Sequence, residues 1–496
     1  MAFEYLVDAL QTVVVPLNFG ILVLSTFVGL LMGMLPGLSA TMAIALLTGI
    51  TYSLPGTTAL ISLIGVYVGS ISGGCQSAIL LNIPGTPASA ATASDGFPMA
   101  NAGNGGMAIF LATTASCLGT LLSVLCVLTL TPVLTSISLK FGSWEFFLLA
   151  IFGVVICGNL TSKGNAVKGW ISGIMGLIVS QVGLDSLSAY PRFAFDNANL
   201  MAGLQLIPIM IGLFGFPEII NAFKKTEVRV LKMSAMNFVE GLRHIKNNFL
   251  AIVRSALIGV GVGIIPGVGE DVGGWLSYWA TKSNSKQPDS FGKGNPAGII
   301  SAEAGNNACI GGAIIPVMSL AVPGSAPAAV LLAAFMMHGY RPGPLLMTET
   351  PEFLYQICLF LMASAVVMWA LALVISRFTV KILGIKKELL MPIIYVLCVV
   401  GSYVINNTLF DIKVMFIFGI LGFFLAAMNY PAAPFLLGVI LGPMADSNLR
   451  RALTITEGNI EPLFTRPICI VFLIMILGLI LSQTGLFSKL RASKQA

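Results

Sequence analysis

Charged residues are scarce in this sequence: Asp, Glu, Lys and Arg make up only 9% of its 496 residues, whereas a soluble domain contains about 25%. Hydrophobic residues make up 56%. Several apolar stretches approach or exceed the ~20 residues that a membrane-spanning helix needs. The composition therefore predicts an integral membrane protein.

Histidine is nearly absent, and the two that occur, His244 and His338, are far apart, which excludes a His-rich metal centre and an HExxH protease. The eight cysteines include no CxxC pair and are expected to be packing residues. No GxxxxGK[ST] phosphate loop is present, so ATP hydrolysis is not expected. The N-terminal segment lacks the basic region of a cleavable signal peptide. Without a nucleophile, base and metal constellation, a membrane enzyme is the least favoured class.

Glycine and proline are abundant, at 53 and 25 residues, so many helices must be kinked, broken or closely packed. We expect an all-α polytopic membrane protein with roughly ten to twelve membrane segments, some broken or re-entrant. The densest basic stretch, between Ala222 and Ser255, is predicted to be cytoplasmic. A second basic segment around Arg377 to Lys387 and a basic C-terminus are assigned to the same side. These patches are expected to set topology, not to bind nucleic acid.

Three motifs occur twice, in the same order. The first is GLLMGMLPGLS at 29–39, which matches GVGVGIIPGVG at 259–269. The others are GSISGGCQSAILLNIPGTP with NNACIGGAIIPVMSLAVPGSAP, and DGFPMANAG with HGYRPGPLL. The alignment places Pro36 over Pro266, Gly73-Gly74 over Gly311-Gly312, and Pro84-Gly85 over Pro323-Gly324.

Duplicated apolar segments with Gly/Pro breaks at corresponding positions are typical of secondary transporters with a site at the repeat interface. We therefore predict a first membrane repeat at 1–222, a basic cytoplasmic connection at 223–254, and a second repeat with C-terminal helices at 255–496. The repeats are expected to be inverted, although duplication alone leaves a parallel arrangement open. The polar insert at 283–298 is predicted to be a solvent loop that could serve a gating role.

Each break is expected to restart a helix whose N-terminus offers unpaired N–H groups and partial positive charge, which suits a carboxylate. The alternative is that the breaks are packing kinks. The predicted substrate-binding residues lie in the two matched breaks: Asn82, Pro84, Gly85, Thr86, Pro87, Ser89, Pro323, Gly324, Ser325 and Ala326.

Carbonyls at the ends of the incoming helices, with nearby Asn and acidic side chains, could bind a small cation such as Na+. The predicted coupling-ion residues are Pro36, Gly37, Ser39, Asp95, Gly267, Glu270, Asp271, Asn306 and Asn307. Acidic residues in apolar surroundings are functional candidates, and Glu303 and Asp446 also qualify. Asp95 could instead cap a helix, and Glu270-Asp271 could simply face a polar mouth. His338 and Arg341 are more consistent with a headgroup-facing role than with substrate binding.

Taken together, GMLPGLSAT, YVGSISGGCQSAILLNIPGTPASAATASDGFPMANAG and AEAGNNACIGGAIIPVMSLAVPGSAPAAVLLAAFMMHGYRPGP resemble the large membrane subunit of tripartite tricarboxylate transporters, the TctA family. The resemblance covers nearly the whole chain. Two positions, Ser72 and Ala302, depart from the family pattern and leave subfamily and substrate open.

The resemblance implies a multi-pass permease of the bacterial inner membrane that imports carboxylates such as citrate with an ion gradient. It implies two partners, a small TctB-like membrane subunit and a periplasmic TctC-like solute-binding protein. No cofactor is expected, and the coupling ion is Na+ or H+. The alternatives are a stand-alone secondary carrier or a channel for organic anions.

Overall fold

The computed structural model describes residues 2–162, 165–222, 231, 234, 236–384 and 387–483. This part of the chain is almost entirely helical, as expected; its strands are the short antiparallel pair β1 (Gly183–Leu184) and β2 (Pro191–Arg192). The basic residues Lys224, Lys225, Arg229 and Lys232 lie outside the described residues, as do those of the C-terminus.

The helices of the first half are α1 (Ala2–Val14), α2 (Pro16–Met34), α3 (Ala40–Thr51), α4 (Gly56–Leu81), the 3-10 turn η1 (Pro87–Ser89), α5 (Ala90–Met99), the π-turn η2 (Ala100–Asn104), α6 (Gly105–Ser138), α7 (Ser143–Thr161), α8 (Ala166–Val179), α9 (Ala198–Met201), α10 (Leu206–Met210), the π-turn η3 (Ile211–Gly215) and α11 (Phe216–Ala222).

The helices of the second half are α12 (Phe238–Asn247), α13 (Phe249–Ile264), α14 (Gly269–Ser283), η4 (Pro288–Ser290), α15 (Pro296–Leu320), α16 (Ala326–Met337), α17 (Leu346–Glu349), α18 (Glu352–Ile375), η5 (Ser376–Phe378), α19 (Thr379–Leu383), α20 (Lys387–Val404), α21 (Leu409–Ala427), α22 (Ala432–Ile455), α23 (Pro462–Thr465) and α24 (Pro467–Gln483).

Seven helices in the described residues are long and apolar enough to cross a membrane, or eight if the bent pair α12–α13 forms one span. This is fewer than the ten to twelve segments expected from apolar stretches. The difference arises because breaks divide the chain into apolar helices of only 10–17 residues, such as α3 and α16, which are too short to span alone.

Two long helices, α4 and α15, lie at the centre and are buried along nearly their whole length. Each crosses a second helix at backbone contact distance. A Cβ on Gly33 of α2 would lie 2.0 Å from the carbonyl oxygen of Ser70 on α4, and one on Gly263 of α13 would lie 2.6 Å from that of Cys309 on α15. Small residues allow such packing within membranes. The α2–α4 and α13–α15 pairs are therefore built in the same way.

The central helices run in opposite directions. Near the end of α4, the side chain of Leu80 lies against Gly105 at the start of α6. Near the end of α15, the carbonyl of Ser319 accepts a hydrogen bond of 3.1 Å from Ser138 at the end of α6. Since α6 is one continuous helix, α4 and α15 point toward opposite ends of the molecule.

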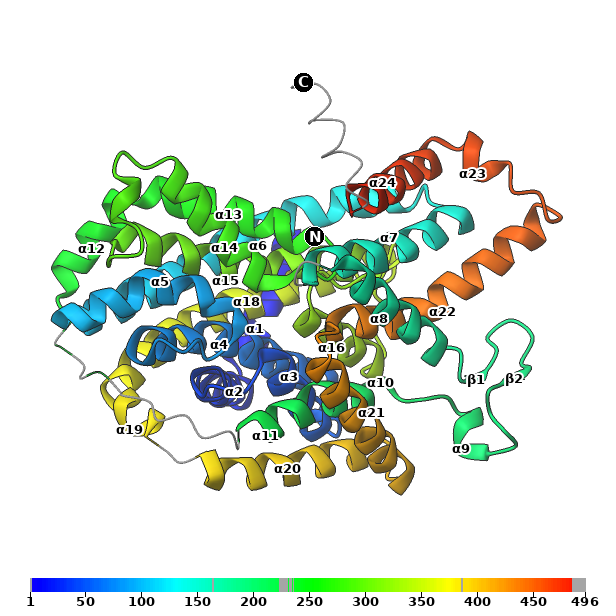
Figure 1. Cartoon of the computed structure of the whole chain (residues 1–496), viewed down its shortest axis with the longest axis horizontal. Helices are drawn as coiled ribbons and strands as arrows, with labels where there is room; N and C mark the ends of the chain where they lie inside the picture. The colour runs from blue at the N-terminus through cyan, green and yellow to red at the C-terminus, as the bar shows by residue number, and fades with distance from the viewer. Residues whose placement is uncertain are drawn as a thin grey trace.

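The basic segments and the strand pair lie at opposite ends of the longest axis. Figure 1 shows α12 and α19, which belong to the two segments predicted to be cytoplasmic, at one end, and β1–β2 at the other. The described helices of the two basic segments, α12 and α19, thus lie at the same end (Figure 1), as a common side of the membrane requires.

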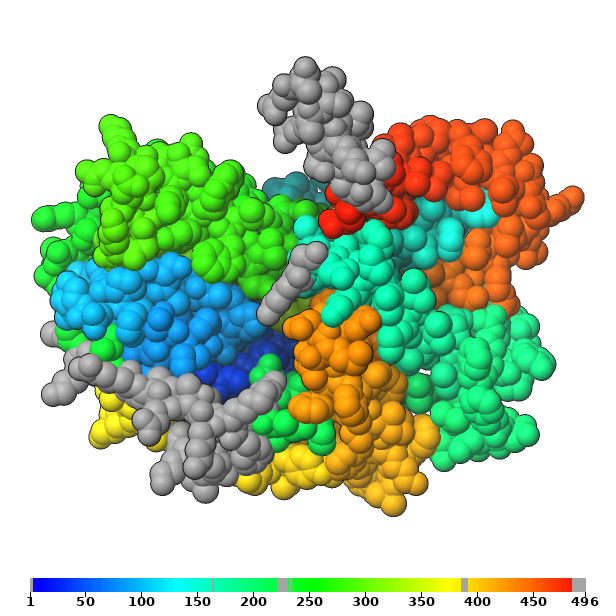
Figure 2. All heavy atoms as spheres, viewed as in Figure 1, coloured from blue at the N-terminus to red at the C-terminus, as the bar shows by residue number. Residues whose placement is uncertain are grey.

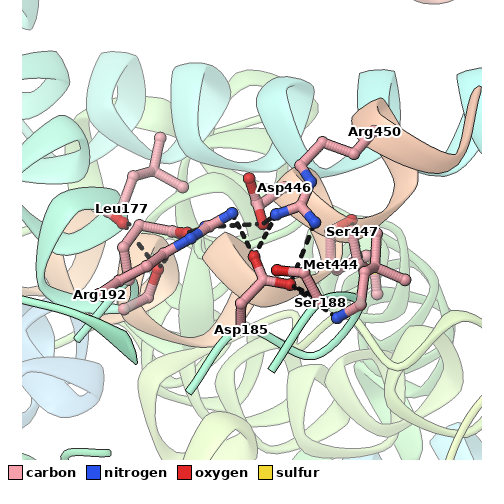
Figure 3. Close-up of polar contacts among 11 residues, drawn as sticks. Leu177, Asp185, Ser188, Arg192, Met444, Asp446, Ser447 and Arg450 are labelled. Atoms are coloured by element: carbon pink, nitrogen blue, oxygen red, sulfur yellow. Dashed lines mark hydrogen bonds and ion pairs between the residues drawn. The ribbon is translucent and has the colours of Figure 1, made fainter. Parts of the chain in front are cut away.

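The strand pair is attached to α22 by an ion-pair cluster (Figure 3). Arg192 on β2 pairs with both Asp185 and Asp446, at 3.0 Å to the latter, and Arg450 pairs with Asp185. Asp185 also accepts backbone N–H groups of Leu187 and Ser188 at 2.7 and 2.8 Å. Asp446, a sequence candidate for function, therefore lies in an attachment between the hairpin and α22.

Acidification is expected to loosen this attachment. The backbone hydrogen bond from Ser188, supported by Arg192 and Arg450, lowers the pKa of Asp185. A carboxyl group with a lowered folded-state pKa stabilises the fold above its unfolded value of about 3.9 and loses that contribution as pH falls through the folded value. Proteolysis between β1 and α10 should therefore stay slow from pH 8 to 5 and accelerate several-fold below pH 4. Asp185→Asn should be cleaved rapidly at every pH, whereas Asp196→Asn, at an exposed position of the same loop, should behave like the wild type.

Candidate functional site

The two matched breaks share a backbone geometry. The C-cap residues that follow α4 and α15, Asn82 and Ala321, are both left-handed, with φ of 56° and 55°. Beyond them, the Gly85 N–H donates to the Gly74 carbonyl at 3.3 Å, and the Gly324 N–H donates to the Ala313 carbonyl at 3.4 Å. Each break thus folds back onto the helix that precedes it.

The breaks after α2 and α13 also correspond. Gly37 and Gly267, each directly after a proline, have φ of 99° and 72°, a region that glycine enters without strain. These breaks contact the first pair closely: a Cβ on Gly85 would lie 2.0 Å from the carbonyl oxygen of Gly33, and one on Gly324 would lie 1.8 Å from that of Gly263. Only glycine fits at either contact.

This geometry moves the predicted alignment by one residue. Gly73 and Gly312 occupy corresponding places, with a Cβ on each 2.4 and 2.5 Å from the carbonyl oxygens of Leu30 and Val260. Gly73 therefore corresponds to Gly312, and Gly74 to Ala313, instead of Gly311 and Gly312. The alignment of Pro84-Gly85 with Pro323-Gly324 is retained.

A cavity of about 230 Å³ lies where these breaks meet. It brings together parts of the chain that are far apart in sequence. Its lining residues are Ser39, Ala40, Thr41, Ile71, Thr86, Pro87, Ala88, Thr161, Phe214, Glu218, Gly267, Val268, Gly269, Glu270, Asp271, Ala326, Pro327 and Ala433. All four broken segments therefore contribute to one cavity.

Four helical segments begin at this cavity. They are α3, the η1–α5 segment, α14 and α16, and the first residues of each are among those that line it. Helix N-termini carry partial positive charge and unpaired N–H groups. The described lining residues include no Lys, Arg or His, so backbone N–H groups are the source of partial positive charge among them.

Two carboxylates from the first turn of α14 also line the cavity. Glu270 is buried and accepts hydrogen bonds from Tyr67 on α4 and, at 2.8 Å, from Ser325 before α16. Asp271 follows it along the chain and lines the same space. Glu270 is a buried acid without a basic partner among the described residues, which is costly unless a cation or proton neutralises it, whereas Asp271 is exposed.

The hydroxyl groups of the two breaks differ in their partners. Ser325 caps α16 by accepting the Ala328 N–H at 3.3 Å, in addition to its bond to Glu270. Thr86, at the corresponding place, is 1% exposed, and its hydroxyl has no partner among the described residues; nor has that of Ser89. Buried hydroxyls are rarely left unpaired, so the first break has hydrogen-bonding capacity that the protein itself leaves unused.

A second cavity of about 270 Å³ adjoins the first and shares Ser39, Pro87 and Glu218 with it. Gly37, Pro84 and Gly85 also line it. Several residues predicted to bind substrate or ion therefore lie on this second space. Five other predicted residues belong to the breaks but are not among the lining residues of either cavity: Pro36, Ser89, Pro323, Gly324 and Ser325.

Two predicted site residues lie elsewhere. Asn82 is exposed and closes the C-terminus of α4, a left-handed position that suits asparagine. Asp95 accepts the N–H groups of residues 292–295 at 2.8 to 3.1 Å on one oxygen and the Tyr278 hydroxyl on the other. It ties the polar insert to α5, and Figure 2 shows the light-blue α5 region packed against the green segments of the second half.

Asn306 and Asn307 form a polar cluster behind the cavity. The Asn306 side chain donates to the carbonyl of Ala88, a lining residue, at 3.0 Å. Asn307 donates to Asn306 at 2.6 Å and accepts from Ser72 at 2.7 Å. The cluster thus contacts the site through the η1 turn.

Some lining residues could not be identified from sequence. Thr161, Phe214, Glu218 and Ala433 lie outside the duplicated motifs, and Tyr67, which bonds to Glu270, is an aromatic residue in an apolar stretch. The one available signal was Tyr67 itself, because a buried tyrosine hydroxyl normally requires a polar partner.

This arrangement, a cavity lined by helix N-termini and acidic side chains among the broken helices of a multi-pass membrane protein, defines the class of membrane transport proteins. Residues 19–437 match the tripartite tricarboxylate transporter TctA family, and the chain belongs to that family of non-enzymatic permeases.

Two proteins of Agrobacterium vitis are similar to the chain. An uncharacterized 52.8 kDa protein in the TAR-I ttuC' 3' region is 33% identical over 459 residues, covering 92% of this chain and 91% of that protein. An uncharacterized protein in the TAR-II ttuC' 3' region is 33% identical over 233 residues, covering 47% of this chain and 96% of that protein. No solved structure matches the chain.

Proposed function

We propose that this chain is the large permease subunit of a tripartite secondary transporter that imports tricarboxylates or related carboxylates with an ion gradient. The observation that carries the proposal is the convergence of four helix N-termini on one cavity. Such N-termini bind carboxylates through backbone N–H groups without a basic side chain. The substrate is assigned to the space beside Thr86, Pro87 and Ala326.

The acids of α14 supply a physical reason for coupling. A carboxylate substrate beside ionised Glu270 and Asp271 is repelled, and this repulsion is strong where water is excluded. A bound Na+ or proton removes it. Substrate and cation then bind more tightly together than separately, which is the thermodynamic requirement for symport.

The opposed directions of α4 and α15, with the same break at the end of each, support the proposal that the halves are inverted repeats. Such repeats commonly place the site near the membrane midplane and exchange its access by moving one group of helices against another. The hydroxyl-bearing residues Thr86, Ser89 and Ser325 of the two breaks are buried, which supports a site inside the protein.

The basic segments indicate which end of the protein faces which side of the membrane. We assign the end bearing α12 and α19 to the bacterial cytoplasm and the end bearing β1–β2 to the periplasm, because basic residues are retained on the cytoplasmic side. A TctC-like binding protein would deliver substrate at the periplasmic end, and a TctB-like subunit would pack against the lipid-facing helices.

Reconstitution tests the proposal. Proteoliposomes containing this chain with the TctB-like and TctC-like subunits should accumulate labelled citrate or another carboxylate when a Na+ or pH gradient is imposed. Uptake that responds to neither gradient would contradict ion coupling. Equally fast uptake by this chain alone would contradict the tripartite arrangement and support a stand-alone carrier.

Thr86 offers a sharper test of the substrate position. Thr86→Val keeps the side-chain shape and removes the hydroxyl, so carboxylate affinity should fall by about tenfold, the equivalent of one lost hydrogen bond to a charged group. Thr86→Ser should retain most of the affinity. Since this hydroxyl has no partner among the residues that the structure describes, the Tm of both variants should stay close to that of the wild type. Equal affinity in all three proteins would remove Thr86 from the site.

A further inference from the structure

Glu303 is a fully buried carboxylate at the centre of the molecule, apart from the cavity. It lies on α15, is 0% exposed, and accepts hydrogen bonds from Thr92 on α5 and, at 2.8 Å, from Ser116 on α6. The Asn307 amide makes a longer contact of 3.4 Å with the same carboxylate. All three partners act as donors, the pattern that stabilises an ionised carboxylate.

This carboxylate has no cationic partner within the described part of the chain: the ion pairs found there involve Asp185, Glu145 and Asp446, not Glu303. Neutral donors only partly replace water around a buried charge. A cation in contact with the carboxylate would supply the missing compensation.

The surroundings provide the ligand type that such a cation needs. Hard cations are held by carboxylate, amide, hydroxyl and carbonyl oxygens. Around Glu303 lie the hydroxyls of Thr92 and Ser116, and Asn306 lies within the same hydrogen-bonded network. Ser89, one helical turn before Thr92, has a buried hydroxyl that the described residues leave without a partner. This unpaired oxygen lies next to Gly74 of α4, beside the hydroxyl of Thr86.

We infer that Glu303, with Thr92, Ser116 and the neighbouring amide side chains, forms a Na+ site separate from the cavity. Its role in coupling rests on the proposed function, but binding of the ion does not. The link to the cavity runs through Asn306, which holds the carbonyl of Ala88, and through Ser89 and Thr92, which belong to the same η1–α5 segment as Thr86. Occupation of the site therefore orders the turn that begins at the cavity.

Thermal unfolding of the full-length purified chain tests the inference without any carboxylate. NaCl is titrated against choline chloride at constant ionic strength and pH. The wild type should show a saturable rise in Tm with Na+, and Glu303→Gln should lose most of it, keeping at most the part that the acids of α14 contribute. Ser116→Ala should keep the response but raise the half-saturating Na+ concentration by about tenfold, as loss of a supporting contact typically does.

Asp411→Asn is the matched control. Asp411 is also a buried carboxylate, 2% exposed, with hydrogen bonds from an amide and a hydroxyl, those of Asn406 and Thr408 at 2.9 and 3.0 Å. It should retain the full Na+ response. If Glu303→Gln fails to fold, the Ser116→Ala shift decides the matter.

Three results would overturn the site. The first is a rise in Tm with Na+ that is undiminished in Glu303→Gln, and the second is an unchanged half-saturating Na+ concentration in Ser116→Ala. The third is a wild-type Tm that does not rise with Na+, even if it rises on acidification. A different result would contradict the proposed function and leave the Na+ site intact. In that case Na+ stabilises the wild type through Glu303, but carboxylate uptake is indifferent to Na+.

Discussion

Replacing Glu270 by glutamine is expected to abolish gradient-driven accumulation of carboxylate while preserving carboxylate binding. The variant removes the charge that repels the substrate and keeps an oxygen that Tyr67 and Ser325 can bond. Carboxylate affinity in the absence of coupling ion should rise toward that of the ion-saturated wild type. The ion dependence of affinity should fall from a factor of up to about 100 to a few-fold, because the coupling free energy is lost.

The measurement compares net uptake with exchange of labelled for unlabelled carboxylate in the same proteoliposomes. Glu270→Gln should lose net accumulation and retain exchange. Tyr67→Phe is the matched variant, since it removes one donor to Glu270 and keeps the acid; it should remain coupled. Full accumulation by Glu270→Gln would show that this carboxylate has no part in coupling.

Gly324→Ala is expected to prevent the second break from folding. A Cβ at this position would lie 1.8 Å from the Gly263 carbonyl oxygen and 2.8 Å from the Cα of Ala313, and both contacts are backbone atoms of buried helices. No side-chain rotation relieves such contacts, so we expect a loss of more than about 3 kcal/mol of stability, beyond ordinary overpacking. Little monodisperse protein should be recovered after detergent extraction.

Gly261→Ala provides the control on α13. A Cβ at Gly261 has no heavy atom within 4 Å, and alanine favours helix, so this variant should be at least as stable as the wild type. Normal yield and Tm for Gly324→Ala would mean that the α13 and α15 breaks are not in backbone contact.

The breaks could be predicted from sequence because proline and glycine act locally. The pairs Pro84-Gly85 and Pro323-Gly324 end their helices wherever they occur in an apolar segment, and their duplication identified them as a matched set. Which breaks would meet could not be predicted, because that depends on the α2–α4 and α13–α15 crossings. The cavity consequently brings together residues predicted from the sequence to bind the substrate and residues predicted to bind the coupling ion.

The burial of Asp95, Glu270 and Glu303 agrees with their apolar surroundings in the sequence, whereas Asp271 is exposed, and the environments of these acids were not predictable. Asp95 and Glu270 both adjoin glycine-rich motifs, yet Asp95 receives four backbone N–H groups of a loop that lies about 200 residues further along the chain. Glu270 meets Tyr67 across the two halves. A local pattern does not encode such long-range partners, so the two acids looked equivalent in the sequence and differ in the fold.

The most direct test of the central claim is the affinity of the purified transporter complex for carboxylate, measured by isothermal titration over a range of Na+ concentrations and pH values. Binding of carboxylate and cation in adjoining sites predicts that affinity rises with Na+ or with acidity, and that carboxylate raises cation affinity by the same factor. Carboxylate affinity independent of both Na+ and pH would contradict the account.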